Sequence, residues 1–389
     1  MKKIVCFVKK EIVLCVAVVL AVLSAFLVPP DGAYAGYIDF RTLGILFCLM
    51  SVMAGLQKIG VFKWIAGKLL AKTRKPSGLV VILVFLCFFF SMAITNDVAL
   101  ITFVPFVFTV GRLLDEKLYR RMVFPTVVLQ TVAANLGSML TPIGNPQNLY
   151  LYGISEMSAL RFVQIMLPYS AVSFGLLAVC CAVLGRRLER DESAEAEEKA
   201  EEGSGADADT IRSGRSLAVY LILFVMCLLT VARILPLGIT LAAVLAGVLI
   251  VDARVLLRVD YCLLLTFVGF FVFIGNMGRL PAFSGFLQRM VAGHEVPVAV
   301  LASQCISNVP AALLLSGFTD NVEGLLIGTN LGGLGTLIAS MASLISYKYV
   351  AAEAEERNLP GGKGRYFLYF TVTNLVFLGI LGILYLCIA

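Results

Sequence analysis

The sequence predicts an all-α polytopic membrane protein with inverted repeats, two re-entrant hairpins and broken transmembrane helices. Of its 389 residues, 60% are hydrophobic and 14% are charged. The mean hydropathy is +0.94, a value that excludes a soluble domain of this length. Polar tips interrupt two long apolar stretches, and the segments around these tips resemble each other in the two halves of the chain.

The first apolar stretch runs from Ile12 to Val28 and imitates a cleavable signal peptide. It follows basic residues and precedes a small-residue triplet, AYA at 33–35. With about 17 residues it is long for a signal core and lies at the short limit for crossing a bilayer. We therefore interpret it as a retained helix that ends before Pro29 and Pro30.

Eight further apolar segments are long enough to cross, which predicts nine spans with the first. These segments are 41–56, 122–150, 161–185, 217–234, 237–252, 259–277, 322–347 and 366–388. Two other stretches, 78–110 and 281–317, are broken by the polar tips ITND and ISNVP. Irregular backbone at membrane depth must be buried in protein or line a cavity. We expect each stretch to form a hairpin that enters the membrane and returns to the same side.

The distribution of basic residues supports this topology. With the N-terminus inside and both hairpins re-entrant, only five of the 31 Lys and Arg residues fall outside. These five are Arg41, Arg161, Arg233, Arg279 and Arg289. We expect the protein to lie in the cytoplasmic (plasma) membrane, with its N-terminus in the cytoplasm and its C-terminus outside.

A charged linker separates two transmembrane halves, 1–185 and 217–389. Residues 186–216 contain ten acidic and six basic residues, a composition typical of a solvated cytoplasmic segment. In the predicted topology the first hairpin opens inward and the second outward. The two halves therefore have opposite orientation, which is the inverted-repeat plan of many secondary transporters.

Glycine, proline and small polar residues interrupt a long apolar helix after each hairpin. They include Gly137, Thr141, Pro142, Gly144, Asn145 and Pro146 in the first half, and Gly332, Gly333, Gly335 and Thr336 in the second. Such breaks expose backbone groups that need a ligand or water. Helix N-termini favour an anion, whereas unwound carbonyls, Asn and Thr oxygens and a carboxylate can hold a cation.

We therefore expect two sets of site residues near the membrane midplane. For the substrate they are Thr95, Asn96, Asn145, Ser307, Asn308 and Thr336. For the coupling ion, Na⁺ or H⁺, they are Asp97, Asn135, Thr141, Gly144 and Asn330. A carboxylate at mid-bilayer depth costs about 2.5 to 3.5 kcal/mol, which favours a functional role for Asp97. Neither set of residues requires a cofactor, or a metal ion other than sodium.

At these residues the sequence resembles the ion transporter superfamily of arsenite-efflux permeases, citrate carriers and divalent anion/sodium symporters. Ser307-Asn308 matches the start of the Ser-Asn-Thr tip motif of the symporters, and Thr95-Asn96 is a looser match. ANLGSMLTPIGNPQN resembles their helix-break segment. Val309 and Asp97 depart from the motif, and the Asn-Asp pair and GTNLGGLGTLIAS are more similar to arsenite permeases.

The resemblance covers nearly the whole chain after residue 36. It implies a scaffold and a moving transport domain, as in elevator-type alternating access, often in a homodimer, with substrate between the hairpin tips. The function we expect is ion-coupled secondary transport of a small anion, either a di- or tricarboxylate or an inorganic oxyanion. The alternatives are an arsenite or other metalloid efflux permease and a sodium/proton antiporter. The expected partners are the small anion and the lipid bilayer, and nucleic acid is not among them.

Other interpretations of these residues remain open at the level of sequence. Gly324, Gly328 and Gly332 are spaced for close helix packing, and the tip asparagines could join helices. Asp97 could pair with a basic residue, and Cys180-Cys181 could coordinate arsenite. An enzyme is disfavoured because the single histidine, His294, has no partner pattern.

The topology can be tested by cysteine labelling. A cysteine placed at Ser204 in the linker, or at Lys117 after the first hairpin, should react with a membrane-impermeant maleimide only from the cytoplasmic side. The parent protein without the added cysteine gives the background. Labelling of either position from outside would exclude the topology with two re-entrant hairpins.

Overall fold

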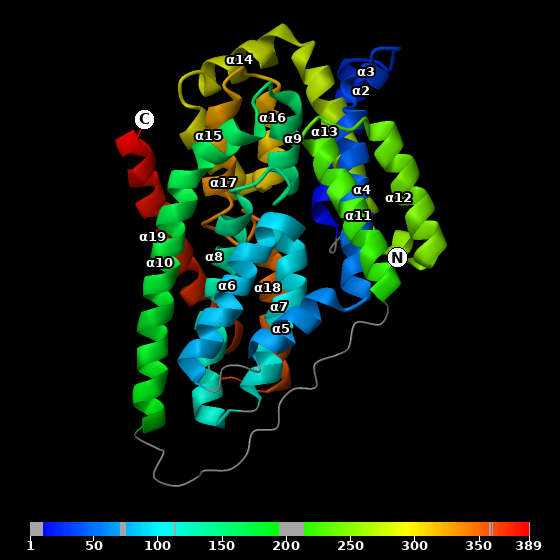
Figure 1. Ribbon diagram of the computed structural model, residues 1–389. Helices are drawn as coiled ribbons and strands as arrows, with labels where there is room; N and C mark the ends of the chain where they lie inside the picture. Colours follow the sequence, from blue (N-terminus) through cyan, green and yellow to red (C-terminus); the bar gives the residue numbers. More distant parts are fainter. Residues whose placement is uncertain are drawn as a thin grey trace. The chain divides into compact units, whose positions relative to one another are not determined.

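The protein is described from a computed structural model that covers residues 11–70, 75–112, 114–193, 214–357, 359 and 361–388. These residues form helices and no strand, in agreement with the all-α expectation (Figure 1). The linker was predicted at 186–216. Its first residues, 186–193, continue a transmembrane helix, whereas 194–213 lie outside the described residues.

The helices divide into two compact units, each assembled from separate parts of the chain. Unit 1 comprises residues up to Gly55, Pro146–Ser158 and Ala218–Gly332. It contains α2 (Ile12–Leu27), α3 (Tyr34–Tyr37), most of α4 (Phe40–Lys58), α9 (Pro146–Ile154), most of α11 (Gly214–Val231), α12 (Leu237–Asp252), η1 (Ala253–Arg258), α13 (Tyr261–Gly278), α14 (Pro281–Val291), α15 (Glu295–Ile306), α16 (Asn308–Ser316) and α17 (Val322–Gly332).

Unit 2 comprises Leu56–Asn145, Ala159–Leu217 and Gly333 onward. It contains α5 (Val61–Leu70), α6 (Pro76–Ile94), α7 (Asn96–Gly111), α8 (Glu116–Ser138), α10 (Ala159–Ser193), α18 (Met341–Glu356) and α19 (Gly362–Ile388). Helix α5 was not predicted; it is short and amphipathic, with Phe62, Ala66 and Leu70 buried.

Seven helices among the described residues are long and apolar enough to cross a bilayer. They are α4, α6, α10, α11, α12 with η1, α13 and α19. Six of these are predicted spans, whereas among the other three of the nine predicted spans α2 has only 16 residues and two are broken into shorter helices; the seventh, α6, was predicted as part of a hairpin. Since α6 alone has 19 residues and is long enough to cross, the re-entrant course of the first hairpin stays a prediction.

Both predicted helix breaks are present. The segment expected at 122–150 is α8, then a non-helical stretch at 139–145, then α9. The segment expected at 322–347 is α17, then a non-helical stretch at 333–340, then α18. The fold class, a polytopic all-α membrane protein with broken helices, is therefore confirmed.

The first helix of unit 1, α2, packs along α13. At their contact Gly269 approaches Ala17, and Asn276 of α13 donates to Ser24 Oγ at 2.9 Å and to Tyr34 Oη at 2.8 Å. The helix stops at Leu27, directly before the predicted exit at the prolines. The stretch that imitates a signal peptide is therefore a packed part of unit 1.

The second predicted hairpin, 281–317, contains three helices. The amphipathic helix α14 comes first, and α15 and α16 then form the hairpin, joined by the single residue Ser307. Within unit 1 this hairpin packs against α17, and α16 also contacts α9 and α13 (Figure 1).

The first hairpin belongs to unit 2 and has the same construction. Helices α6 and α7 are joined by the single residue Thr95, and both pack against α8. A Cβ atom on Gly137 of α8 would overlap the carbonyl oxygen of Phe88 on α6, so only glycine permits this approach. The hairpin is thereby held against the helix that breaks.

A polar cluster joins the other end of this hairpin to α18. Glu353 is 5% exposed and accepts hydrogen bonds from Arg112 Nη2 at 2.8 Å and from Tyr119 Oη. Arg357 lies 3.6 Å from the same carboxylate and 4.8 Å from the Tyr119 ring centroid. A buried carboxylate is tolerated when it is paired in this way, so the cluster fixes α7, α8 and α18 together.

Candidate functional site

The two hairpin tips have the same unusual backbone. Thr95 has φ 72° and ψ 149°, and Ser307 has φ 74° and ψ 154°. Among the described non-glycine residues, only Arg233 shares a positive φ with them. A residue with a side chain such as Thr or Ser is strained in this conformation, and strained residues of this kind cluster at functional sites. Each strained residue is followed by a buried asparagine, Asn96 or Asn308, that begins the next helix.

In unit 2, Asn135 joins the hairpin tip to the second non-helical stretch, 333–340. Its Oδ1 accepts from Asn96 Nδ2 at 3.0 Å and from Ser340 Oγ at 3.0 Å. Its Nδ2 donates to the Gly333 carbonyl at 3.5 Å. Because one side chain on α8 bonds to both the hairpin tip and the stretch 333–340, Asn135 positions these two segments relative to each other.

Backbone and side-chain bonds extend this network through the first break. The Asn96 amide donates to the Gly144 carbonyl at 3.1 Å, and Thr141 Oγ1 donates to the Met92 carbonyl. Asn145 Nδ2 donates to Ser138 Oγ at 3.2 Å. Groups that the interrupted helix would leave unsatisfied are thus bonded to the hairpin and to each other.

Asp97 occupies the first turn of α7, immediately after the tip. Its amide donates to Asn96 Oδ1 at 2.9 Å, and its side chain is partly buried. The positive end of the helix dipole favours a carboxylate at this position. The structure therefore places near one tip six residues that the sequence assigned to two sets: Asn96 and Asn145 for the substrate, and Asp97, Asn135, Thr141 and Gly144 for the coupling ion. Their roles stay predictions. Thr336 lies in the second break of the same unit and is exposed.

In unit 1 the corresponding residues form a different network. Asn308 accepts a long hydrogen bond of 3.4 Å from Ser307 Oγ, and both residues are buried. Asn330 Nδ2 donates to Asn148 Oδ1 at 2.6 Å and to the Leu326 carbonyl at 2.8 Å. Gln304 Nε2 donates to the Gly332 carbonyl at 2.9 Å, which joins α15 to the end of α17.

The two units repeat one packing contact in detail. Asn135 and Asn330 each begin the sequence NLG, and the glycine of each motif lies against a hairpin serine. A Cβ on Gly137 would lie 2.6 Å from Ser91 Oγ, and a Cβ on Gly332 would lie 2.6 Å from Ser303 Oγ. Each serine precedes its tip residue by four positions. Gly324 and Gly328 also approach α15, so close packing is a real role of these glycines.

Several residues of these networks were not predicted. Ser340, Asn148 and Gln304 are small or amide side chains; Asn148 ends the quoted segment ANLGSMLTPIGNPQN and Ser340 ends GTNLGGLGTLIAS, but no role was assigned to either. Ser138 and Ser303 also belong to this group. The repeated NLG motif was the one available signal, because it marks where each helix approaches its hairpin.

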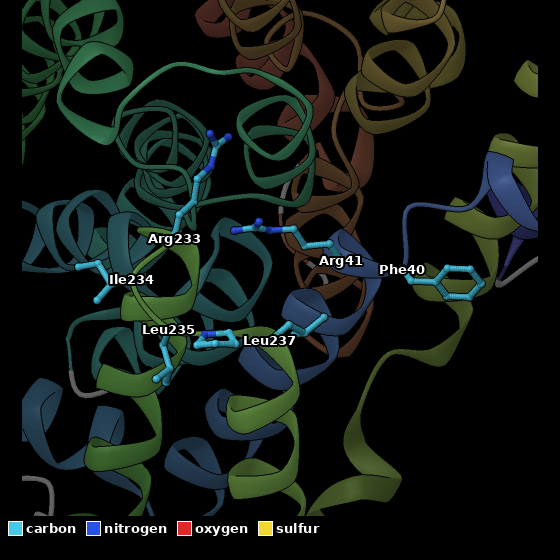
Figure 2. Close-up of a pocket in the computed structure, with 7 residues that line it drawn as sticks. Phe40, Arg41, Arg233, Ile234, Leu235 and Leu237 are labelled. Carbon is cyan, nitrogen blue, oxygen red and sulfur yellow. The ribbon is translucent and has the colours of Figure 1, made fainter.

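The end of α9, the helix that follows the first break, is fixed by Arg233. Its guanidinium donates to the carbonyls of Tyr152, at 3.0 Å, and Ser155, and lies over the Tyr152 ring. Arg233 and Arg41 also line a cavity of about 400 Å³ with Phe40 and residues 234–237 (Figure 2). None of the predicted site residues lines this cavity, so we assign Arg233 to the stabilisation of α9.

Comparison with known proteins identifies relatives over most of the chain. A family model described as "Citrate transporter" matches residues 4–323. An uncharacterized transporter of Methanocaldococcus jannaschii is 32% identical over 315 residues, which cover 80% of this chain and 81% of that protein. Inner membrane protein YbiR of Escherichia coli is 30% identical over 332 residues, 84% of each chain. The silicon efflux transporter LSI3 of Oryza sativa is 33% identical over 149 residues, 38% of this chain and 29% of LSI3.

The role of Asn135 can be measured with a double-mutant cycle. Asn96→Ala, Asn135→Ala and the double variant should be non-additive in free energy of unfolding by about 1 kcal/mol, because each single variant already breaks the shared hydrogen bond. The readout is the denaturant-induced unfolding of the detergent-solubilised protein.

A control cycle pairs Asn96 with Asn374, a buried asparagine of unit 2 that donates to its own helix at Phe370. That pair should be additive. Additive energies for Asn96 and Asn135 would show that the bond does not hold the tip.

Proposed function

Because the chain belongs to the citrate transporter family, we propose that it is an ion-coupled secondary transporter of a small anion, with di- and tricarboxylates as the first candidates. It is a membrane transporter and not an enzyme. The observation that supports the anionic substrate most directly is the pair of strained tips, each followed by a buried asparagine at a helix N-terminus.

Each tip, taken by itself, has the chemistry that recognises a carboxylate. Helix α7 begins at Asn96 and α16 begins at Asn308, so the positive end of a helix dipole lies at each tip. Backbone amides and asparagine Nδ2 groups donate hydrogen bonds, and bonds to an ionised acceptor are stronger than neutral ones. Asparagine supplies this recognition without placing a permanent positive charge at membrane depth.

The coupling ion is the second part of the proposal. Asp97 follows Asn96, whose amide bonds to the Gly144 carbonyl, and Thr141 places a hydroxyl oxygen on the same hairpin. Carboxylate, carbonyl and hydroxyl oxygens are the donors that bind hard cations, and a carboxylate alone can carry a proton. Since Asn135 Oδ1 already accepts two hydrogen bonds, we assign it to positioning and leave Asp97 as the principal ion-binding group.

We propose elevator-type alternating access in a homodimer, with the N-terminus in the cytoplasm and the C-terminus outside. The cytoplasmic membrane is supported by the name of YbiR, an inner membrane protein of comparable length. The orientation is supported by the distribution of Lys and Arg.

A second candidate is efflux of a metalloid, because one relative is named a silicon efflux transporter. Silicic and arsenous acids are largely uncharged at neutral pH and present hydroxyl groups. Asn96, Ser307 and Asn308 could bind hydroxyl groups by hydrogen bonding. Such a substrate would make no use of the positive helix ends at the tips.

A transport assay separates these candidates. In proteoliposomes with an imposed sodium or proton gradient, we expect accumulation of citrate or succinate, tested beside sulfate, arsenite and silicic acid. Asn308→Ala should weaken binding of the transported anion by about 1 to 3 kcal/mol, because it leaves buried polar groups unpaired. Movement of arsenite or silicic acid alone would refute the carboxylate assignment and favour metalloid efflux.

The coupling role of Asp97 is tested by Asp97→Asn, which keeps the shape of the side chain but cannot ionise. We expect this variant to retain substrate exchange across the bilayer while losing accumulation driven by the ion gradient. Asp115→Asn serves as a control, because Asp115 caps the start of α8 at an exposed position. Accumulation at the wild-type level by Asp97→Asn would show that this carboxylate only stabilises the start of α7.

A further inference from the structure

A second cavity lies in unit 2 among three helices that all contact one another, α8, α10 and α19. Its volume is about 500 Å³. Most of its wall is apolar and includes Pro125, Leu129, Val179 and Val183. None of the residues predicted for substrate or coupling ion lines it, so transport chemistry does not explain it.

Each of the three helices contributes one arginine to this cavity: Arg121, Arg187 and Arg365. Arg121 lies in the second turn of α8, Arg187 near the end of α10 and Arg365 in the first turn of α19. The topology predicted from charge places these three helix ends on the cytoplasmic side. No acidic residue is among the described residues that line the cavity.

The apolar wall extends away from the arginines along the same helices. Leu129 lies two turns after Arg121, and Val179 lies two turns before Arg187, which is about 12 Å of helix in each case. Val179 is 62% exposed and Val183 is 46% exposed, so this part of the cavity opens to the surroundings of the helices. In a transmembrane helix those surroundings are hydrocarbon.

Tyr369 lines the same cavity one helical turn after Arg365 on α19. The Arg365 guanidinium lies 5.7 Å from the centroid of the Tyr369 ring, which orients it by a cation–π contact. Tyrosine is enriched where hydrocarbon meets lipid head groups, because its ring is apolar and its hydroxyl is polar. The cavity thus changes from charged to amphipathic to apolar over two turns of helix.

We propose that this cavity binds one anionic phospholipid of the cytoplasmic leaflet, with its phosphate on Arg121, Arg187 and Arg365 and an acyl chain along Leu129, Val179 and Val183. Guanidinium groups bind phosphate oxygens in pairs of hydrogen bonds, and basic pockets between transmembrane helices are a known type of head-group site. A soluble anion would use the arginines alone and leave about 12 Å of apolar wall without a role.

The arginines are tested by lipid binding to the purified full-length protein, measured by native mass spectrometry. The lipids are palmitoyl-oleoyl phosphatidylglycerol and palmitoyl-oleoyl phosphatidylcholine. We expect the wild-type protein to prefer phosphatidylglycerol. Arg187→Gln/Arg365→Gln should weaken phosphatidylglycerol binding about fivefold for each arginine removed, and so on the order of 25-fold, with little change for phosphatidylcholine.

A matched control removes the same charge elsewhere. Arg190 and Arg258 are exposed, lie outside this cavity, and belong to the same predicted membrane face, so Arg190→Gln/Arg258→Gln should keep the preference. Equal binding by the cavity variant and the control would overturn the proposal. Both variants are first shown by thermal unfolding to be as stable as the wild-type protein, so that a loss of lipid binding does not reflect misfolding.

The proposed contact between the acyl chain and the apolar wall is tested separately. Val183→Trp fills the exposed apolar wall and leaves all three arginines in place, so it should also abolish the preference for phosphatidylglycerol. Inorganic phosphate and glycerol 3-phosphate should bind the wild-type protein far more weakly than the lipid. Undiminished lipid binding by Val183→Trp, or equal affinity for the soluble phosphates, would identify a soluble-anion site and refute the lipid assignment.

Discussion

The constraint on which this structure depends is that backbone amides and carbonyls have no water to bond with inside a bilayer. An unsatisfied group there costs several kcal/mol, so a chain can break a helix only where other groups replace the lost hydrogen bonds. In unit 2 the break at 139–145 meets this requirement through the hairpin. Gly144 accepts from the Asn96 amide, and Thr141 donates to the Met92 carbonyl. The hairpin tip and the break are therefore one assembly.

Glycine makes that assembly sterically possible. At Gly137 and Gly332 a helix approaches its hairpin so closely that a Cβ would collide with a serine placed four residues before the tip. The same contact occurs in both units, although the surrounding side chains differ. A contact repeated with the same residues at the same spacing indicates duplication of one structural unit more strongly than similar hydropathy does.

The general architecture could be predicted from sequence because its signals are local. Apolar length gives spans, and the run of Gly, Thr, Pro and Asn from 137 to 146 marks a helix break regardless of its partners. The tips were recognisable because ITND and ISNVP are polar within long apolar stretches. Asn96 and Asn145 could accordingly be assigned to the substrate, and Asn135, Thr141 and Gly144 to the coupling ion, before any contact was known.

Other features depend on contacts that local sequence does not encode. The separation of α14 from the second hairpin rests on a turn around Gly293, within a stretch that is apolar on both sides. The roles of Ser340 and Asn148 depend on which asparagine each one meets after folding. A serine or an asparagine within an apolar segment has many possible partners, so pattern alone cannot choose among them.

The two repeats are alike in backbone but not in charge, and this difference constrains the mechanism. Asn96 is followed by Asp97, whereas Asn308 is followed by Val309. The first tip is bonded to its break through Asn135 and Gly144, whereas the described side-chain bond of Asn308 comes from its neighbour Ser307. Of the two tips, ITND and ISNVP, the first alone carries an ionisable residue, so protonation of Asp97 or binding of a cation to it changes the charge at that tip alone. The two tips, each taken by itself, therefore differ in kind, because the second keeps a constant charge whereas the charge of the first depends on the ionisation of Asp97.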